Sequence, residues 1–117
     1  MTANNIQDYQ MFIDGQWTEA ENNQRFESTN PENNKPWSSF PDATVNDVNN
    51  AVAAAKNAFK SWSLSDVKIR AQYLRAIGDQ LKKNAEHIGK IETIDSGKLL
   101  KETKFQAEYM KDYFYYY

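Results

Sequence analysis

The stretch Ile91-Glu92-Thr93-Ile94-Asp95-Ser96-Gly97-Lys98 ends a helical pattern on a glycine that lies between acidic and basic side chains. Glycine directly after an apolar helical run is typical of a left-handed residue at a helix carboxyl end. Asp95 falls where free carbonyl groups concentrate negative potential, so its carboxylate needs a cation or a hydrogen-bond donor nearby. Two interpretations stay open. The corner binds a hard cation such as potassium or sodium, or Asp95 accepts backbone hydrogen bonds or pairs with Lys98.

Composition limits the classes of protein that fit this chain. Its 117 residues correspond to about one domain. A net charge of -2 provides no basic field for nucleic acid or an anionic membrane, and no apolar run reaches the length of a spanning helix. The absence of cysteine excludes disulfides and thiolate ligands, and it fits a reducing, cytoplasmic location.

The first 41 residues carry signals for short strands. Residues 1–8 are polar, and we expect them to be a disordered N-terminus. Asp14-Gly15 separates two strand-like runs and predicts a tight hairpin turn with positive φ at both residues. Pro31 disfavours helix at Asn30, so the segment from Phe26 is predicted to be extended and to end in a turn.

After Pro41 the apolar periodicity changes from 2 to 3.6 and predicts four helices. Thr44 and Asp47 form a capping box, a second helix starts near Asp66, and Asn84 is predicted to cap a third. The predicted apolar faces comprise Val48, Val52, Ala55, Phe59 and Trp62; Ala71, Leu74, Ile77 and Leu81; Ile88, Ile91 and Ile94; and Phe105, Tyr109, Tyr113 and Tyr116.

The chain shows no autonomous catalytic machinery. Its only histidine, His87, lies in the first turn of a predicted helix and is interpreted as a solvated surface group. The four glycines are scattered and form no phosphate-binding loop. The last residues, Tyr115-Tyr116-Tyr117, form a helix end that needs a partner surface, so we expect the chain to be truncated, with the missing sequence immediately downstream.

In this order, the signals resemble the amino-terminal quarter of an aldehyde dehydrogenase subunit, from about Met11 to Tyr117. The resemblance rests on Phe12 to Trp17, Phe26 to Pro31, Asp47-Val48, Ala51-Val52, Ala54-Ala55, Ala58-Phe59, Trp62, Arg70-Ala71, Leu74, Glu92-Thr93, Asp95, Gly97-Lys98 and Tyr113 to Tyr117. It implies an α/β fold: the first part of a Rossmann-like nucleotide-binding domain, with a peripheral hairpin and short strands followed by about four helices. Residues 9–117 would be the N-terminal portion of that domain.

The resemblance also implies a function for the complete protein. Aldehyde dehydrogenases oxidise an aldehyde to a carboxylic acid with NAD or NADP, through a cysteine thioester that water activated by a glutamate hydrolyses. None of the catalytic or cofactor-binding residues falls in this quarter, so we expect the chain alone to be inactive. Its implied partners are the remainder of its own polypeptide, a small-molecule aldehyde and identical subunits in a dimer or tetramer.

Two smaller sites are implied residue by residue. In the family a monovalent cation, potassium or sodium, is held by backbone oxygens before the Asn-Pro turn and by the acidic residue before Gly-Lys; here these are Ser28, Thr29 and Asp95. Side chains of the following helix line the aldehyde tunnel, and Gln106 and Met110 match those positions. Met110 as core filler is an open alternative. Leu99 stands where a proline is common in the family.

Two functions of other classes remain as alternatives. The first is a small non-catalytic α+β interaction module that uses its tyrosine-rich last helix to grip a partner, because aromatic surfaces favour interfaces. The second is a degenerate paralogue that regulates an intact enzyme, which no residue specifically supports.

Overall fold

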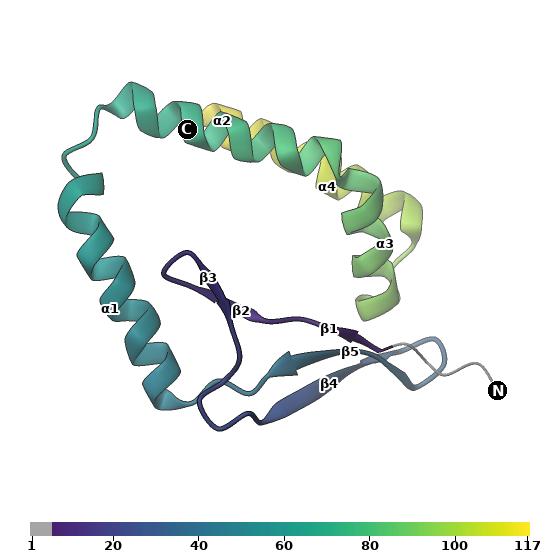
Figure 1. Ribbon diagram of the computed structural model, residues 1–117. Helices are drawn as coiled ribbons and strands as arrows, with labels where there is room; N and C mark the ends of the chain where they lie inside the picture. Colours follow the sequence, from purple (N-terminus) through teal and green to yellow (C-terminus); the bar gives the residue numbers. More distant parts are fainter. Residues whose placement is uncertain (1–5) are drawn as a thin grey trace. The chain divides into compact units, whose positions relative to one another are not determined.

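The computed structural model describes residues 6–117, and these fall into two compact units. The strand unit contains residues up to Thr29 together with Asn34–Leu64, and the helical unit contains Asn30–Asn33 together with Ser65–Tyr117. Figure 1 labels the helices and strands of both units.

A hairpin in the strand unit joins β2 (Met11–Ile13) and β3 (Gln16–Thr18) as an antiparallel pair. Asp14 and Gly15 form its turn with φ of 53° and 78°. This is the positive-φ turn that the sequence predicts, and it is favoured because its twist matches that of the flanking strands. Phe12 and Trp17 face each other across the pair, with ring centroids 4.9 Å apart.

The other strands form a three-stranded sheet in the order β1 (Gln7–Asp8), β5 (Lys35–Pro41) and β4 (Arg25–Asn30). β1 runs parallel to β5, with Gln7 opposite Ser38. Part of the predicted disordered terminus is therefore a strand, which pairs with β5 and whose Asp8 carboxylate accepts a hydrogen bond from Ser39 Oγ at 2.7 Å. Residues 1–5 of that predicted segment lie outside the described residues.

Helix α1 (Val45–Trp62) begins at the predicted capping box. The Thr44 side chain accepts from the Asp47 backbone N–H at 3.2 Å, and Asp47 Oδ2 accepts from the Thr44 N–H at 2.8 Å. Asp47 also accepts from the backbone N–H of Glu21, which ties the loop after β3 to the start of α1. This network satisfies donors that the first helical turn leaves free.

The helical unit consists of α2 (Val67–Lys83), α3 (Ala85–Ser96) and α4 (Leu100–Tyr116). Asp66 caps α2 as predicted, accepting from the Lys68 N–H at 2.7 Å. Asn84 does not cap α3 with its side chain; it donates to the Gln80 carbonyl at 2.8 Å and so closes the end of α2. Asn84 is the N-cap residue of α3, as predicted, and its carbonyl accepts from the Ile88 N–H at 2.9 Å, but its side chain satisfies the end of α2 instead.

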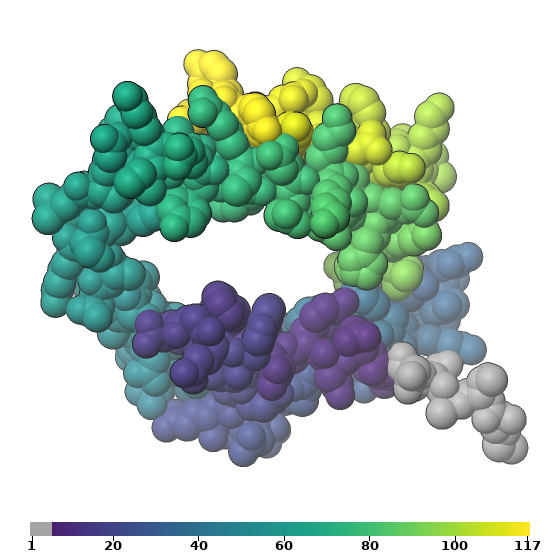
Figure 2. Space-filling view, turned by 45° about the horizontal axis from the view of Figure 1, so that its top comes forward, coloured from purple at the N-terminus to yellow at the C-terminus, as the bar shows by residue number. Residues whose placement is uncertain are grey.

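Helix α4 packs against both α2 and α3 (Figure 1). In Figure 2 the yellow side chains at the end of α4 lie against the green ones of α2. Two glycines allow this approach. A Cβ on Gly78 would lie 3.2 Å from the Lys111 carbonyl, and one on Gly89 only 2.8 Å from the backbone of Lys104.

The apolar faces predicted to be buried are largely exposed in residues 6–117. On α1, Val48 is 53% exposed and Phe59 64%, and on α2 Ile77 is 46% exposed. The buried apolar side chains of the described residues are Ala20, Pro41, Ala85 and Ala107. Periodicity predicted these faces correctly as apolar but wrongly as buried, because it cannot show what packs against them.

The Asp47 network makes a pH-dependent contribution to stability. Backbone and side-chain hydrogen bonds from Thr44 hold the pKa of the Asp47 carboxyl below its ordinary value of 3.8. A lowered pKa in the folded state stabilises fully above the unfolded value and is lost as pH falls through the folded pKa. We predict that Asp47→Asn lowers the melting temperature at neutral pH and that the deficit disappears as the pH falls below 3.8 and through the lowered pKa of the folded state.

Thermal unfolding followed by circular dichroism from neutral to acidic pH measures this deficit. Asp42→Asn, which removes an exposed carboxylate just before α1, is the matched control and should leave the neutral-pH melting temperature unchanged. A deficit for Asp47→Asn that persists unchanged at acidic pH would contradict this role of the carboxylate.

Candidate functional site

The predicted glycine corner is present at the end of α3. Gly97 has φ of 74° and donates its N–H to the Thr93 carbonyl at 2.9 Å, which confirms the predicted left-handed residue. Pro31 packs against it, because a Cβ on Gly97 would lie 3.1 Å from Pro31 Cγ. The Asn-Pro turn therefore belongs to the helical unit together with the Gly-Lys motif.

The polar groups of this corner pair in a way that the sequence did not reveal. Lys98 Nζ donates to Glu92 Oε1 at 2.7 Å, so the ammonium group has an acidic partner other than Asp95. Ser96 Oγ donates to the Glu92 carbonyl at 2.6 Å and accepts from the Lys98 N–H at 3.3 Å. These contacts close the carboxyl end of α3 over its last turn.

The three residues of the predicted cation site lie on two elements. Ser28 and Thr29 are in β4, the first half-buried and the second exposed, and they belong to the strand unit. Asp95 is exposed in the last turn of α3 and belongs to the helical unit. The cation site therefore stays a prediction.

Thr103 fixes the start of α4 against α3. Its side chain is fully buried, and its hydroxyl donates to the Gly89 carbonyl at 2.9 Å. The Thr93 hydroxyl lies 2.9 Å away and is then the donor in that pair. Sequence reasoning missed this contact because a threonine and a glycine fourteen positions apart carry no local signal.

The predicted tunnel residues share one side of α4. Gln106 and Met110 are four positions apart, and both are exposed, Met110 by 43%. This exposure shows that Met110 does not fill a core formed by residues 6–117. The role of Gln106 and Met110 in lining an aldehyde tunnel stays a prediction.

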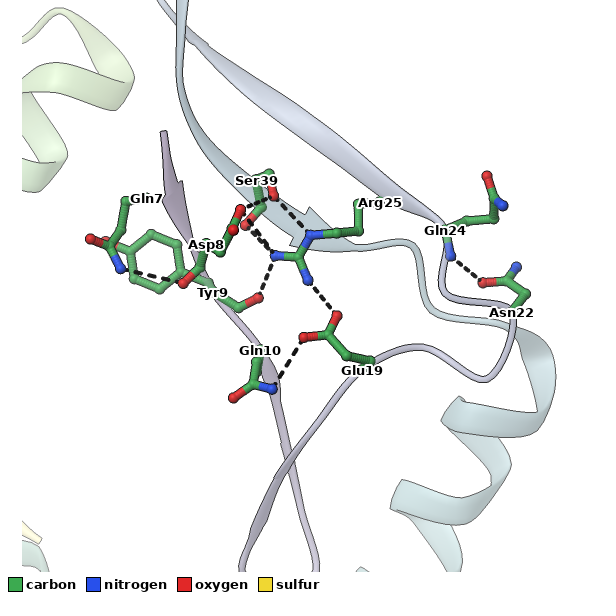
Figure 3. Close-up of polar contacts among 9 residues, drawn as sticks. All are labelled: Gln7, Asp8, Tyr9, Gln10, Glu19, Asn22, Gln24, Arg25 and Ser39. Atoms are coloured by element: carbon green, nitrogen blue, oxygen red, sulfur yellow. Dashed lines mark hydrogen bonds and ion pairs between the residues drawn. The ribbon is translucent and has the colours of Figure 1, made fainter. Parts of the chain in front are cut away.

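Arg25 is the main polar hub of the strand unit (Figure 3). Its Nε donates to Ser39 Oγ at 2.8 Å, and its Nη2 donates to the carbonyls of Tyr9 at 2.7 Å and Ser39 at 3.0 Å. Ion pairs to Glu19 and Asp8 complete the set. One guanidinium thus joins β1, β4, β5 and the segment after β3, because its planar donors can serve several acceptors at once.

The described residues offer little for catalysis on their own. Within residues 6–117 no three histidine, cysteine or acidic side chains gather as metal ligands, and His87 is exposed as predicted. The sequence supplies no thiol nucleophile. No helix in the described part of the chain combines the length and apolar character needed to cross a bilayer.

Comparison with known proteins identifies the family. The sequence profile of the aldehyde dehydrogenase family matches residues 17–117. The chain belongs to the aldehyde dehydrogenase family. This confirms the resemblance inferred from the ordered motifs.

Individual aldehyde dehydrogenases are similar over nearly the whole chain. Aminoaldehyde dehydrogenase 1, peroxisomal, of Pisum sativum is 38% identical over 113 residues, which are 92% of this chain and 22% of that protein. A (Z)-2-((N-methylformamido)methylene)-5-hydroxybutyrolactone dehydrogenase of Acinetobacter baylyi is 34% identical over 96% of this chain and 23% of its own length. The chain therefore spans less than a quarter of the relatives that it matches.

Solved aldehyde dehydrogenases share the fold. A betaine aldehyde dehydrogenase of Staphylococcus aureus, crystallised with NAD+, superimposes with a TM-score of 0.88 at 32% identity over 92% of this chain and 22% of that one. An NAD-dependent aldehyde dehydrogenase of Sinorhizobium meliloti, 24% identical, gives a TM-score of 0.91 over 95% of this chain and 23% of that one. The predicted α/β fold, with short strands followed by four helices, is confirmed.

The contact at Gly89 is open to a direct test. Gly89→Ala places a methyl group against the backbone of Lys104, which cannot move aside as a flexible side chain can. We predict a loss of about 1–3 kcal/mol in the free energy of unfolding, measured by urea denaturation. His87→Ala, an exposed change in the same helix, should have little effect. Equal stabilities of the two variants would contradict the close α3–α4 contact.

Proposed function

We propose that residues 9–117 form the first part of the nucleotide-binding domain of an NAD(P)-dependent aldehyde dehydrogenase that oxidises an aldehyde to a carboxylic acid. The observation that carries the proposal is the coincidence of two facts. Similarity to aldehyde dehydrogenases covers 92% or more of this chain, and the apolar faces of its helices are exposed. Large exposed apolar surfaces mark places where further protein binds.

In this proposal the chain is a scaffold and the chemistry comes from additional polypeptide. A cysteine nucleophile is required for a thioester, and this sequence has none. The described residues also contain no glycine-rich loop for a dinucleotide, since the four glycines lie in a hairpin turn, in two helix–helix contacts and at a helix end. We therefore assign no cofactor contact and no catalytic step to these residues.

The same polypeptide would contribute to the aldehyde tunnel through Gln106 and Met110. Their exposure on one side of α4 supports a lining role. From the resemblance we also propose a cytoplasmic homo-oligomer, a dimer or tetramer. The interaction-module alternative explains the exposed tyrosines of α4 but gives no reason for the family match from residue 17 to residue 117.

A chimera tests the proposed function. Residues 6–117 replace the matching quarter of the Staphylococcus aureus betaine aldehyde dehydrogenase, and NADH formation is followed with that enzyme's own aldehyde. We predict activity in the chimera, because the two segments share their fold. The same enzyme without its first quarter, and the 117-residue chain alone, should be inactive. A folded chimera without activity would contradict the proposal.

We also propose a monovalent cation, potassium or sodium, at Ser28, Thr29 and Asp95. The proposal rests on the resemblance, because these positions match the extended segment before Asn-Pro and the acidic residue before Gly-Lys. Carboxylate and backbone carbonyl oxygens are suitable ligands for a hard cation.

We predict that the chimera melts at a lower temperature when potassium is replaced by N-methylglucamine at equal ionic strength. Binding to the folded state alone raises its stability, so removing the ion removes that contribution. Asp95→Ala should abolish the response, whereas Glu102→Ala, an exposed acid in the first turn of α4, should preserve it. A wild-type response retained in Asp95→Ala eliminates the site.

A further inference from the structure

The strand β1 is joined to its sheet by a very short ladder. It is two residues long and pairs with β5 alone, and just beyond it the Tyr9 N–H donates to the Ser39 carbonyl at 3.0 Å. Parallel pairing is slightly weaker per residue than antiparallel pairing, so a ladder this short does not hold a strand by itself. Side chains must therefore fix residues 7–10, here called the strap.

Arg25 contacts the strap directly and through Ser39 (Figure 3). Its Nη2 donates to the Tyr9 carbonyl at 2.7 Å and lies 3.7 Å from a carboxylate oxygen of Asp8. Ser39 Oγ accepts from Arg25 Nε at 2.8 Å and donates to Asp8 at 2.7 Å. One guanidinium thus holds both the backbone and a side chain of the strap against β5.

These contacts include ion pairs that are partly open to solvent. Glu19 forms an ion pair with Arg25 and also accepts from Gln10, the last residue of the strap, at 3.1 Å. The Arg25 side chain is 26% exposed and the Asp8 side chain 73%. Because salt screens exposed charges, it weakens ion pairs of this kind. Salt should therefore loosen the strap.

The strap also has one apolar anchor. The Tyr9 ring stacks on Phe40, with centroids 5.2 Å apart and planes 7° apart, and meets the edge of Trp37 at 6.3 Å. Tyr9 is only half-buried, so water reaches part of this contact. A terminal segment with one anchor and one cluster of polar contacts opens at a lower free energy than the sheet to which it is attached.

We propose that residues 7–10 open and close on β5 as a strap while the rest of the strand unit stays folded, and that the Arg25 guanidinium is the latch that keeps the strap closed. Opening leaves β5 as an edge strand at Ser39, and unpaired edges favour pairing with other chains. The closed latch protects this edge. The strap precedes residue 17, where the match to the family profile begins, and the inference does not rest on the proposed function.

Exchange of the Tyr9 amide in the 117-residue chain, followed by NMR, measures the opening. The Asp42 N–H, which donates to the Gln24 carbonyl at 2.8 Å, is the internal reference outside the strap. We expect the protection of Tyr9 to fall about threefold between about 0.05 M and about 1 M sodium chloride, while that of Asp42 stays within about twofold. A Tyr9 amide that is unprotected, or whose protection does not respond to salt, overturns the proposal.

Variants separate a latch from a generally stabilising arginine. Arg25→Met keeps an apolar stem without the donors, and it should lower Tyr9 protection at least about tenfold and abolish the salt response, because hydrogen bonds from a charged donor are the stronger kind. Arg25→Lys should keep part of the protection and the salt response. Arg75→Met, which alters an exposed arginine of α2, is the matched control and should change neither amide. An equal loss at Tyr9 and Asp42 in Arg25→Met overturns the latch.

Discussion

Residues 6–117 bury few apolar side chains, so the hydrophobic effect contributes little to their stability. The other features of the structure depend on this constraint. The buried apolar side chains are three alanines and Pro41. In contrast, every valine of α1 and every isoleucine of α2 is more than two-fifths exposed, and so are three tyrosines of α4. The accessible surface is 9255 Å². Two separate folded domains of half this mass would expose only about 7,900 Å². The surface in excess is what we propose that the rest of an aldehyde dehydrogenase covers.

Polar and backbone contacts hold neighbouring strands and helices together where a larger apolar core would otherwise do so. The Arg25 guanidinium joins three strands, Asp47 joins a loop to the start of α1, and Thr103 joins α4 to α3. The glycines at 78 and 89 let helix backbones approach closely, which brings many weak dispersion contacts into range. Such contacts fix how neighbouring elements lie. They do not replace the burial of large apolar side chains as a source of stability.

Local chemistry predicted those features whose cause lies within a few residues. The Asp14-Gly15 turn, the Thr44–Asp47 capping box and the left-handed Gly97 each depend on φ or on a hydrogen bond inside one turn. The contacts of Arg25 with Tyr9 and Ser39, and of Thr103 with Gly89, escaped notice because these partners lie fourteen or more positions away. Asn84 lies at the predicted start of α3, but local pattern alone does not show that its side chain bonds to the end of α2.

The candidate site was less predictable than the fold for the same reason. The sequence identified the Gly-Lys corner and offered an ion pair between Lys98 and Asp95 as one interpretation. In the structure Lys98 instead pairs with Glu92, six positions earlier, because the chain turns at the end of α3. The period of 3.6 identified the apolar faces of the helices, but it could not show whether other residues pack against them.

Amide hydrogen exchange in α1 tests most directly whether additional polypeptide completes the interior. An isolated helix of 18 residues is only marginally stable in water, so α1 needs a surface to pack against. We expect its central amides to exchange at least about a hundredfold faster in the 117-residue chain than in the chimera with the remaining three-quarters of an aldehyde dehydrogenase. Equal and strong protection in both proteins would show that the chain completes its own interior and would contradict this account.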